Sequence, residues 1–140
     1  MNPPALLPLE SFPLKSYDKL RYADTDRQGH VNNAVFATFL ETGRVEMLYP
    51  DQNQLITPNN SFVIASLQLD LLAEIKWPGK VDIATGVMHV GNSSFKLYQQ
   101  LFQHGVVVAK ATSVLVQVNA KGKSEPLSEE AKTILQGYII

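Results

Sequence analysis

The sequence predicts an α+β fold in which an antiparallel sheet of about five strands curls around one long helix. Three patterns lead to this prediction. One stretch has the apolar spacing of an amphipathic helix, several stretches have the alternation of strands, and turn-forming residues separate consecutive strand-like stretches. A lone amphipathic helix must bury its apolar stripe, and the sheet offers the surface for it.

The N-terminal part of the chain is rich in proline. Residues 1–15 contain four prolines, which predicts an irregular arm ahead of a single domain over 16–140. A short strand is expected at about 17–22, followed by a polar stretch over 23–29.

The long helix is predicted over residues 32–48. Pro50 and the polar run 51–61 end it and form a loop. The apolar residues of the helix fall at offsets 0, 3, 4, 7 and 11, on one helix face, and are Phe36, Phe39, Leu40, Gly43 and Met47.

The clearest strand pattern covers residues 63–77, where every odd-numbered residue is apolar. Such alternation predicts a long antiparallel strand with one buried face. The unpaired edges of the resulting sheet favour a symmetric oligomer. Three further strands are expected at 81–90, 95–103 and 106–118, with turns at Gly91-Asn92 and His104-Gly105, then a short helix at 128–136 with Ser128 as its N-cap.

Composition excludes several functional classes. Twelve basic and 13 acidic residues give a formal charge of −1, which lacks the basic footprint of nucleic-acid binding, and no membrane partner is expected. The absence of cysteine excludes disulfide scaffolds and thiolate catalysis. The N-terminus does not read as a signal peptide, so a cytoplasmic location is expected. His89 and His104 have no second ligand at metal spacing, so neither a metal nor a cofactor is expected.

A dense polar cluster, Arg21–Asn33, lies where the first strand leads into the long helix. Turn and cap roles explain such residues by hydrogen bonding alone. Although the turn and cap roles are the more common case, a functional interpretation is also open, because the first N–H groups of the helix, at Asn32 and Asn33, form a natural oxyanion site. A carboxylate just ahead of them would attack an acyl carbonyl or activate water against it.

The segment RYADTDRQGHVNNAVFATFLETGR resembles the motif of the hotdog-fold acyl-CoA thioesterases of the 4-hydroxybenzoyl-CoA thioesterase family. The resemblance runs from about residue 17 to the C-terminus and includes the Trp77-Pro78-Gly79 turn and the segment 91–95. It implies a helix wrapped in a sheet, dimers that join two sheets and often pair into tetramers, and active sites at the dimer interface. It also implies hydrolysis of acyl-CoA or a similar thioester.

The resemblance assigns candidate roles to individual residues. The catalytic aspartate of the family matches Asp26, as nucleophile or general base, whereas Asp24 matches a more structural position. Related plant acyl-carrier-protein thioesterases have an asparagine two positions after the aspartate, where this chain has Gln28. His30 either positions water or the thioester carbonyl, or it is a packed structural group.

Other candidates have simpler explanations beside the functional one. Glu41 would replace Asp26 as base, as a helix carboxylate does in some hotdog thioesterases, but its spacing from Arg44 also fits a surface ion pair. Ser94 would hold water in a partner subunit's site, or simply serve in a hairpin turn. The residues expected to contact the substrate are Gln28, Gly29, Phe36, Phe39, Leu40 and Ser94.

The sequence therefore predicts an acyl-CoA thioester hydrolase that forms a homodimer or homotetramer. Two alternatives share its pattern: an acyl-carrier-protein thioesterase, and a non-catalytic module that binds acyl thioesters on the same fold. The length and type of the acyl chain are left open by the pattern.

Overall fold

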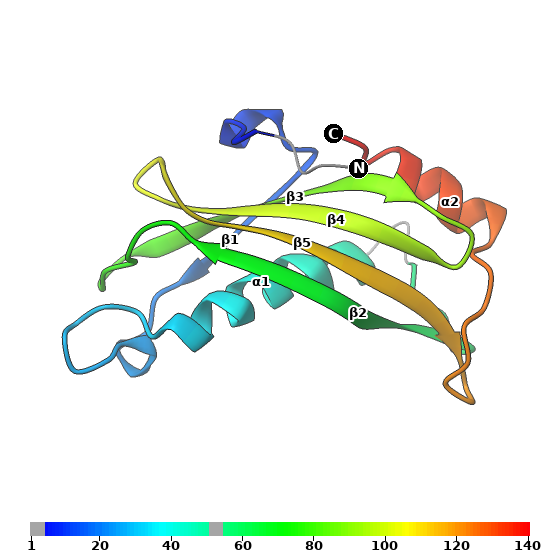
Figure 1. Ribbon diagram of the computed structural model, residues 1–140, viewed down its shortest axis with the longest axis horizontal. Coiled ribbons are helices and arrows are strands. Elements are labelled where there is room, and N and C mark those ends of the chain that lie inside the picture. Colours follow the sequence, from blue (N-terminus) through cyan, green and yellow to red (C-terminus); the bar gives the residue numbers. More distant parts are fainter. Residues whose placement is uncertain (1–4, 51–54) are drawn as a thin grey trace.

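The computed structural model describes residues 5–50 and 55–140. Five strands form one antiparallel sheet in the order β1-β3-β4-β5-β2, and the sheet curves around helix α1 (Figure 1). The predicted sheet around one long helix is thus confirmed. The elements are η1 (Leu9–Ser11), β1 (Leu14–Lys19), η2 (Tyr22–Asp24), α1 (Asn33–Leu48), β2 (Asn60–Leu71), β3 (Lys80–Val90), β4 (Ser94–Gln103), β5 (Val106–Asn119) and α2 (Glu129–Gln136).

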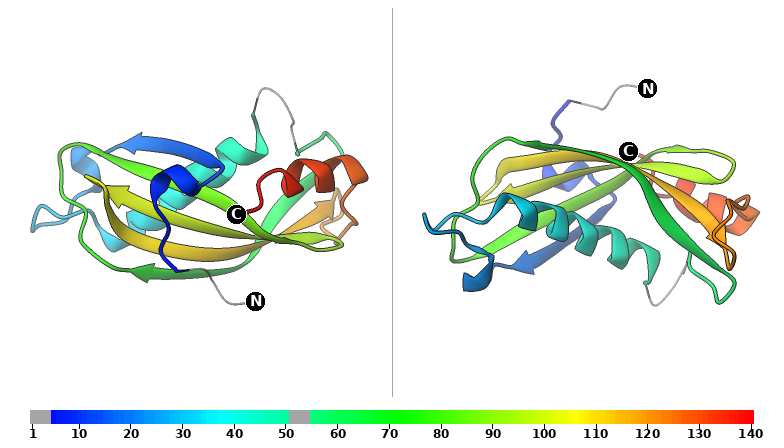
Figure 2. Two further views of the ribbon diagram at one scale, coloured as in Figure 1. Left: turned by 90° about the horizontal axis from the view of Figure 1, so that it is seen from above. Right: turned by 60° about the horizontal axis from the view of Figure 1, so that its bottom comes forward.

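Helix α1 lies along the concave face of the sheet (Figure 2). Asn32 caps it, because its Oδ1 accepts a hydrogen bond from the Ala34 N–H at 2.9 Å. The helix packs against the sheet at Gly43 without room for a side chain, because a Cβ there would lie 2.7 Å from Ile83 Cγ2 and 2.9 Å from Gln99 Nε2. Every residue of the predicted apolar stripe is buried: Phe36, Phe39, Leu40, Gly43 and Met47.

The later strands and α2 lie close to their predicted positions. The turn at Gly91-Asn92 joins β3 to β4, and the turn at His104-Gly105 joins β4 to β5. Ser128 caps α2, since its hydroxyl accepts a hydrogen bond from the Ala131 N–H at 3.0 Å. These local predictions are confirmed.

Strand β2 differs from its prediction. It ends at Leu71 rather than at 77, and a bulge between Ile64 and Ser66 shifts its register against β5. Ile64 pairs with Leu115 and Leu67 with Ser113, so the bulge turns the alternation over within the strand. Because β2 forms the edge of the sheet, Val63, Ile64, Leu67 and Leu71 stay 40–47% exposed. The prediction that this strand has one buried face is therefore wrong for the single chain.

The described part of the N-terminal arm is more regular than predicted. Strand β1 already begins at Leu14, and Phe12 stacks on Tyr98 with ring centroids 6.0 Å apart. The Gln100 side chain brackets Leu7, accepting from its N–H and donating to its C=O at 2.9 Å each. The arm is thus fastened to the convex face of the sheet, opposite α1 (Figure 1). Residues 1–4 of the predicted arm lie outside the described residues.

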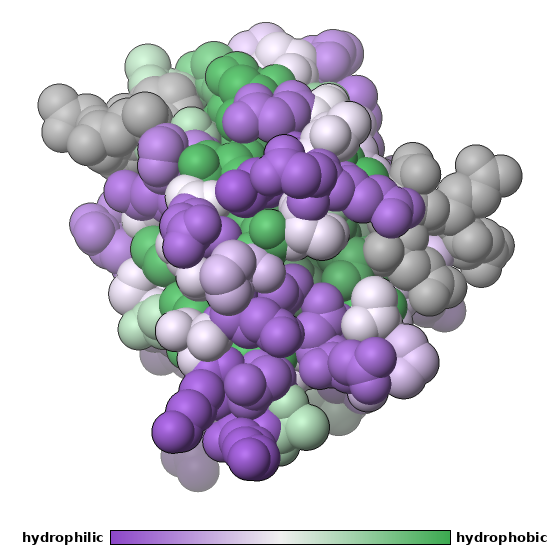
Figure 3. Space-filling model, turned by 90° about the vertical axis from the view of Figure 1, so that its right-hand side faces the viewer, coloured by the Kyte–Doolittle hydropathy of each residue, from purple (hydrophilic) through white to green (hydrophobic). Residues whose placement is uncertain are grey.

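Helix α2 lies at the end opposite the turn that precedes α1 (Figure 1), and hydrophilic side chains cover much of that end (Figure 3). None of the helices within residues 5–50 and 55–140 has the length and apolar character needed to cross a membrane.

Candidate active site

A tight turn over residues 26–30 is built around the Asp26 carboxylate. Its Oδ1 accepts hydrogen bonds from the Gln28 N–H at 2.8 Å and the His30 N–H at 3.2 Å. The Asp26 N–H donates to the His30 carbonyl at 2.7 Å and closes the turn. Gly29 has a φ of +82°, in the left-handed region that favours glycine. The carboxylate is therefore exposed to solvent and yet held in place by its own loop.

Asp24 has a structural environment. It is buried, and its carboxylate accepts hydrogen bonds at 2.9 Å from the Arg21 N–H and from Arg21 Nη2. This side-chain hydrogen bond, together with the Asp24 charge, raises the pKa of the Arg21 guanidinium. The Asp24 carbonyl accepts from the Asn32 N–H at 2.8 Å, which ties the polar loop to the beginning of α1.

The two predicted oxyanion donors have different surroundings. Because the Asn32 N–H already donates to Asp24, it is not free to bind an oxyanion, and this part of the prediction is corrected. Among the described residues, the Asn33 N–H has no acceptor. It stands at the first position of α1, where the helix dipole favours negative charge. Asn33 therefore remains the candidate donor.

His30 connects the turn to the segment that follows β2. Its backbone forms a bridge with Lys76, and the adjacent Val31 N–H donates to the Ile75 carbonyl at 2.8 Å. His30 Nδ1 lies 3.2 Å from Glu74 Oε1, so the imidazole and the carboxylate are in contact across the cavity lining.

A buried glutamine holds this segment in place. Gln103, at the end of β4, accepts from the Lys76 N–H at 2.9 Å and donates to the Lys76 carbonyl at 2.8 Å. Since Lys76 bridges with His30, Gln103 holds the segment that follows Glu74 next to the turn of residues 26–30. Gln103 was not predicted from the sequence; the available signal was a cluster of glutamines in the second half of a strand whose other residues there are apolar or aromatic.

These elements enclose a cavity of about 400 Å³, within the size range of small-molecule sites. A carboxylate, an imidazole and the beginning of a helix border it, beside apolar side chains from α1 and from the end of β2. This arrangement can hold an acyl carbonyl next to a base or nucleophile. The lining residues are Asp26, Gln28, His30, Val31, Asn33, Phe36, Leu71, Leu72, Ala73 and Glu74.

Several predicted substrate contacts lie elsewhere in the single chain. Phe36 lines the cavity, whereas Phe39 and Leu40 do not line it and belong to the core between α1 and the sheet. Gly29 shapes the turn without being part of the lining. Ser94 is the first residue of β4, whereas Gln103, which bonds the Lys76 backbone beside the site, is the last. The two residues are roughly 30 Å apart along the strand. A contact between Ser94 and a site would have to involve a partner subunit, as the sequence analysis expected.

Glu41 is exposed on α1 and is not part of the cavity lining. Within the described residues, no Glu41–Arg44 ion pair forms within 4.0 Å. Burial lowers the pKa of the half-buried Arg44 guanidinium, and the Glu41 charge opposes this effect. Within one chain, Glu41 therefore neither borders the cavity, as a base would, nor pairs with Arg44.

One part of the cavity lining was not predicted from the sequence: Leu71, Leu72, Ala73 and Glu74. Their alternation predicts the continuation of a long strand, but β2 ends at Leu71 and the following residues border the cavity beside the turn of residues 26–30. No local signal marks Glu74 as the partner of an imidazole that lies 44 residues earlier.

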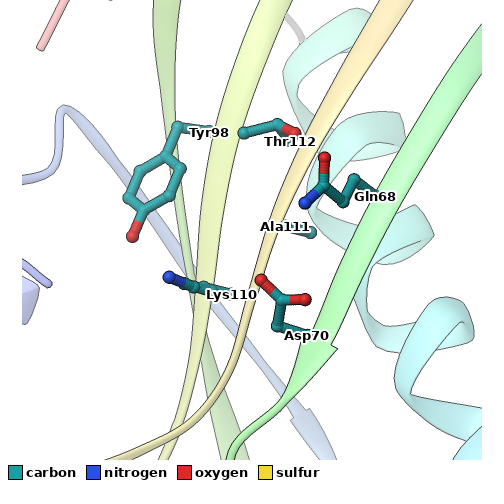
Figure 4. Close-up of a pocket in the computed structure, with 6 residues that line it drawn as sticks. All are labelled: Gln68, Asp70, Tyr98, Lys110, Ala111 and Thr112. Carbon is teal, nitrogen blue, oxygen red and sulfur yellow. The ribbon is translucent and has the colours of Figure 1, made fainter. Parts of the chain in front are cut away.

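A second hollow lies on the opposite face of the sheet, between β2, β4 and β5 (Figure 4). It encloses about 20 Å³, which suits about one water molecule. The Tyr98 hydroxyl donates to Gln100 Oε1 at 2.8 Å, and burial raises the pKa of Tyr98. This hollow is too small for an acyl group. The cavity beside Asp26 is the candidate active site because it brings that carboxylate together with His30 and the beginning of α1.

Comparison with known proteins identifies the family. The Thioesterase-like superfamily matches residues 20–135, and the chain belongs to this superfamily. The acyl-CoA thioesterase YbgC of Haemophilus influenzae is 29% identical over 122 residues, which cover 84% of this chain and 86% of that protein. The resemblance stated from the sequence motif is thus confirmed at the level of the family.

Solved structures share the fold over nearly the whole chain. A predicted thioesterase from Bacillus stearothermophilus is 27% identical with a TM-score of 0.79, covering 90% of this chain and 96% of that one. A thioesterase from Thermus thermophilus, solved in complex with coenzyme A and Zn, is 28% identical with a TM-score of 0.78, covering 92% and 96%. The protein therefore has the predicted hotdog fold.

Within residues 5–50 and 55–140, no group of three or more acidic or histidine side chains is arranged to hold a metal ion.

Proposed function

We propose that this protein is a thioesterase that hydrolyses acyl-CoA, or a similar acyl thioester, to a free acid and a thiol. The observation that carries the proposal is that Asp26, His30 and the first turn of α1 border one cavity with apolar side chains beside them. The family and the activity named for its relative from Haemophilus influenzae support the same class of reaction.

Asp26 is the reacting carboxylate in this proposal. Oδ1 accepts two backbone hydrogen bonds, so Oδ2 is the oxygen available for chemistry. Oδ2 either attacks the thioester carbon, forming an anhydride and releasing the thiolate before water completes hydrolysis, or takes a proton from the attacking water. In both routes the carbonyl oxygen lies toward the Asn33 N–H, where the helix N-terminus stabilises the developing negative charge.

His30 and Gln28 are positioning groups beside this carboxylate. In this proposal Nδ1 carries the proton and faces Glu74, 3.2 Å away, and Nε2 accepts a hydrogen bond from the water or from the released thiol. Gln28 lines the cavity and can donate and accept hydrogen bonds, as the asparagine of the related plant enzymes would.

The site is completed in this proposal by a second copy of the chain. The edge strand β2 carries exposed apolar side chains, and its end forms one wall of the cavity through Leu71 and Leu72. Pairing of two β2 edges would bury these side chains and place the partner beside the cavity. A tetramer would add a second interface. The cytoplasmic location expected from the sequence stays a prediction.

Release of the thiol tests the proposed activity directly. The protein is incubated with a panel of acyl-CoAs, and separately with an acyl group bound as a thioester to a carrier protein. A colorimetric reagent records the free thiol, and binding is measured in parallel. We expect saturable thiol release with at least one acyl-CoA. Saturable binding without thiol release from any thioester would contradict hydrolysis and favour the non-catalytic binding module.

A further inference from the structure

Two aromatic side chains stand exposed beside the loop that carries Asp26. Tyr22 in η2 is 76% exposed and Trp77, between β2 and β3, is 44% exposed. Their rings meet edge to face, with centroids 5.5 Å apart and planes at 77°. Two large aromatic side chains in contact with each other at the surface form an apolar patch of the kind that marks binding sites.

The pair lies within reach of the cavity. Tyr22 precedes Asp26 by four residues and Trp77 follows Glu74 by three. A chain spans at most about 3.6 Å per residue, so the Cα atoms of each pair lie within about 14 Å and about 11 Å of each other. Gln103 holds the Lys76 backbone next to Trp77, so the platform and the cavity share one supported segment.

Three exposed basic residues are close to the two aromatic residues in the sequence. Arg21 directly precedes Tyr22, and its side chain is 72% exposed although it bonds Asp24. Lys76 directly precedes Trp77, is exposed, and makes no ion pair with any residue of the described chain. Arg27 belongs to the same turn as Asp26, is exposed, and makes no ion pair with any of the described residues. The two short segments that carry the exposed aromatic pair, and the adjoining turn, thus also carry groups that bind phosphate.

We propose that Tyr22 and Trp77, with Lys76, Arg21 and Arg27, bind the adenosine 3′-phosphate 5′-diphosphate end of coenzyme A. The adenine ring stacks on the exposed aromatic surface, and the cations pair with the phosphates. The long pantetheine arm of coenzyme A connects this platform to the cavity, where the thioester meets Asp26. The inference rests on the proposed function and extends it, because the prosthetic arm of a carrier protein has no adenine nucleotide. The platform therefore selects CoA thioesters over carrier-protein thioesters.

Tryptophan fluorescence tests the platform without any substitution, since Trp77 is the sole tryptophan of the chain. The protein is titrated separately with coenzyme A, with adenosine 3′,5′-bisphosphate and with pantetheine. We expect saturable quenching with coenzyme A and with the bisphosphate, and no saturable change with pantetheine. Absence of a saturable change with coenzyme A, or an equal change with pantetheine, would overturn the proposal. This assay reports binding, so it remains informative even if no thioester is hydrolysed.

Kinetics with a truncated substrate provide the second test. Trp77→Ala should raise the ratio of KM for an acyl-CoA to KM for the matching acyl-pantetheine thioester by roughly tenfold, the effect of one base stacked on an aromatic side chain. Trp77→Phe keeps an aromatic ring and should retain most of the selectivity, which protects the test against misfolding of the alanine variant. Tyr49→Ala, at a tyrosine just after α1 that is 56% exposed, against 44% for Trp77, is the matched control and should leave the ratio unchanged. An unchanged ratio in a folded Trp77→Ala variant would overturn the proposal, even if the wild-type protein proves to be a thioesterase.

Discussion

Replacing Gln103 by leucine removes both hydrogen bonds that hold the Lys76 backbone, at 2.9 and 2.8 Å. Each such bond contributes about 0.5–1.5 kcal/mol, and leucine has nearly the volume of glutamine, so we expect the free energy of unfolding to fall by about 1–3 kcal/mol. Lys76 bridges with His30, so the change also loosens the segment that carries Glu74. A misplacement of about 1 Å can cost about a hundredfold in rate, and we expect kcat/KM to fall at least about tenfold.

The chain supplies a matched control for this variant. Gln100, three residues earlier on β4, brackets the Leu7 backbone through two bonds of 2.9 Å and also accepts from the Tyr98 hydroxyl. Gln100→Leu should therefore destabilise the protein at least as much as Gln103→Leu. Because it acts on the N-terminal arm, its kcat/KM should stay within about twofold of wild type.

Urea unfolding and thiol-release kinetics on both variants decide the matter. The positioning role of Gln103 requires that two comparably destabilised proteins differ in turnover. Equal losses of activity in the two variants, or full activity in folded Gln103→Leu, would refute it.

Three other variants, the first of them with a matched control, concern the turn, the helix and the sheet edge. Gly29→Val forces a β-branched residue to a φ of +82° and should abolish most turnover, whereas Gly122→Val, at a φ of +77° with equally open surroundings, should cost similar stability and leave activity intact. Gly43→Ala brings a Cβ to 2.7 Å from Ile83 and should lower the free energy of unfolding in urea by about 1–3 kcal/mol, although alanine is the better helix former. Leu67→Lys on β2 should shift the mass in solution, measured by light scattering at micromolar concentration, from dimer toward monomer; a wild-type protein that is already monomeric would contradict the interface.

The parts of the fold that were predictable have local causes. The stripe on α1 and the turns at Gly91 and Gly105 follow from spacing and turn chemistry within a few residues. The β2 strand was mispredicted because the bulge after Ile64 inverts its alternation, and a bulge depends on the register against β5. The expected burial of one face was also wrong, because β2 is the last strand of the sheet and has a neighbouring strand, β5, on one edge only.

The candidate site divides in the same way. The turn around Asp26 is local, so its carboxylate, Gly29 and His30 were all recognisable from one short motif. Glu74 and Gln103 come from other elements, and only the tertiary structure places them beside His30 and Lys76. The loss of the Asn32 N–H as an oxyanion donor has the same origin, because its acceptor, the Asp24 carbonyl, lies across the turn.

The most direct test of the central claim is the rate of thiol release by Asp26→Asn relative to wild type. The amide oxygen of asparagine can still accept from the Gln28 and His30 N–H groups, so the turn is kept while the charge is removed. With the best acyl-CoA of the panel, the account predicts a rate at least about a hundredfold lower in a variant whose unfolding curve matches wild type. A rate close to wild type in that folded variant would contradict the assignment of Asp26 as the reacting carboxylate.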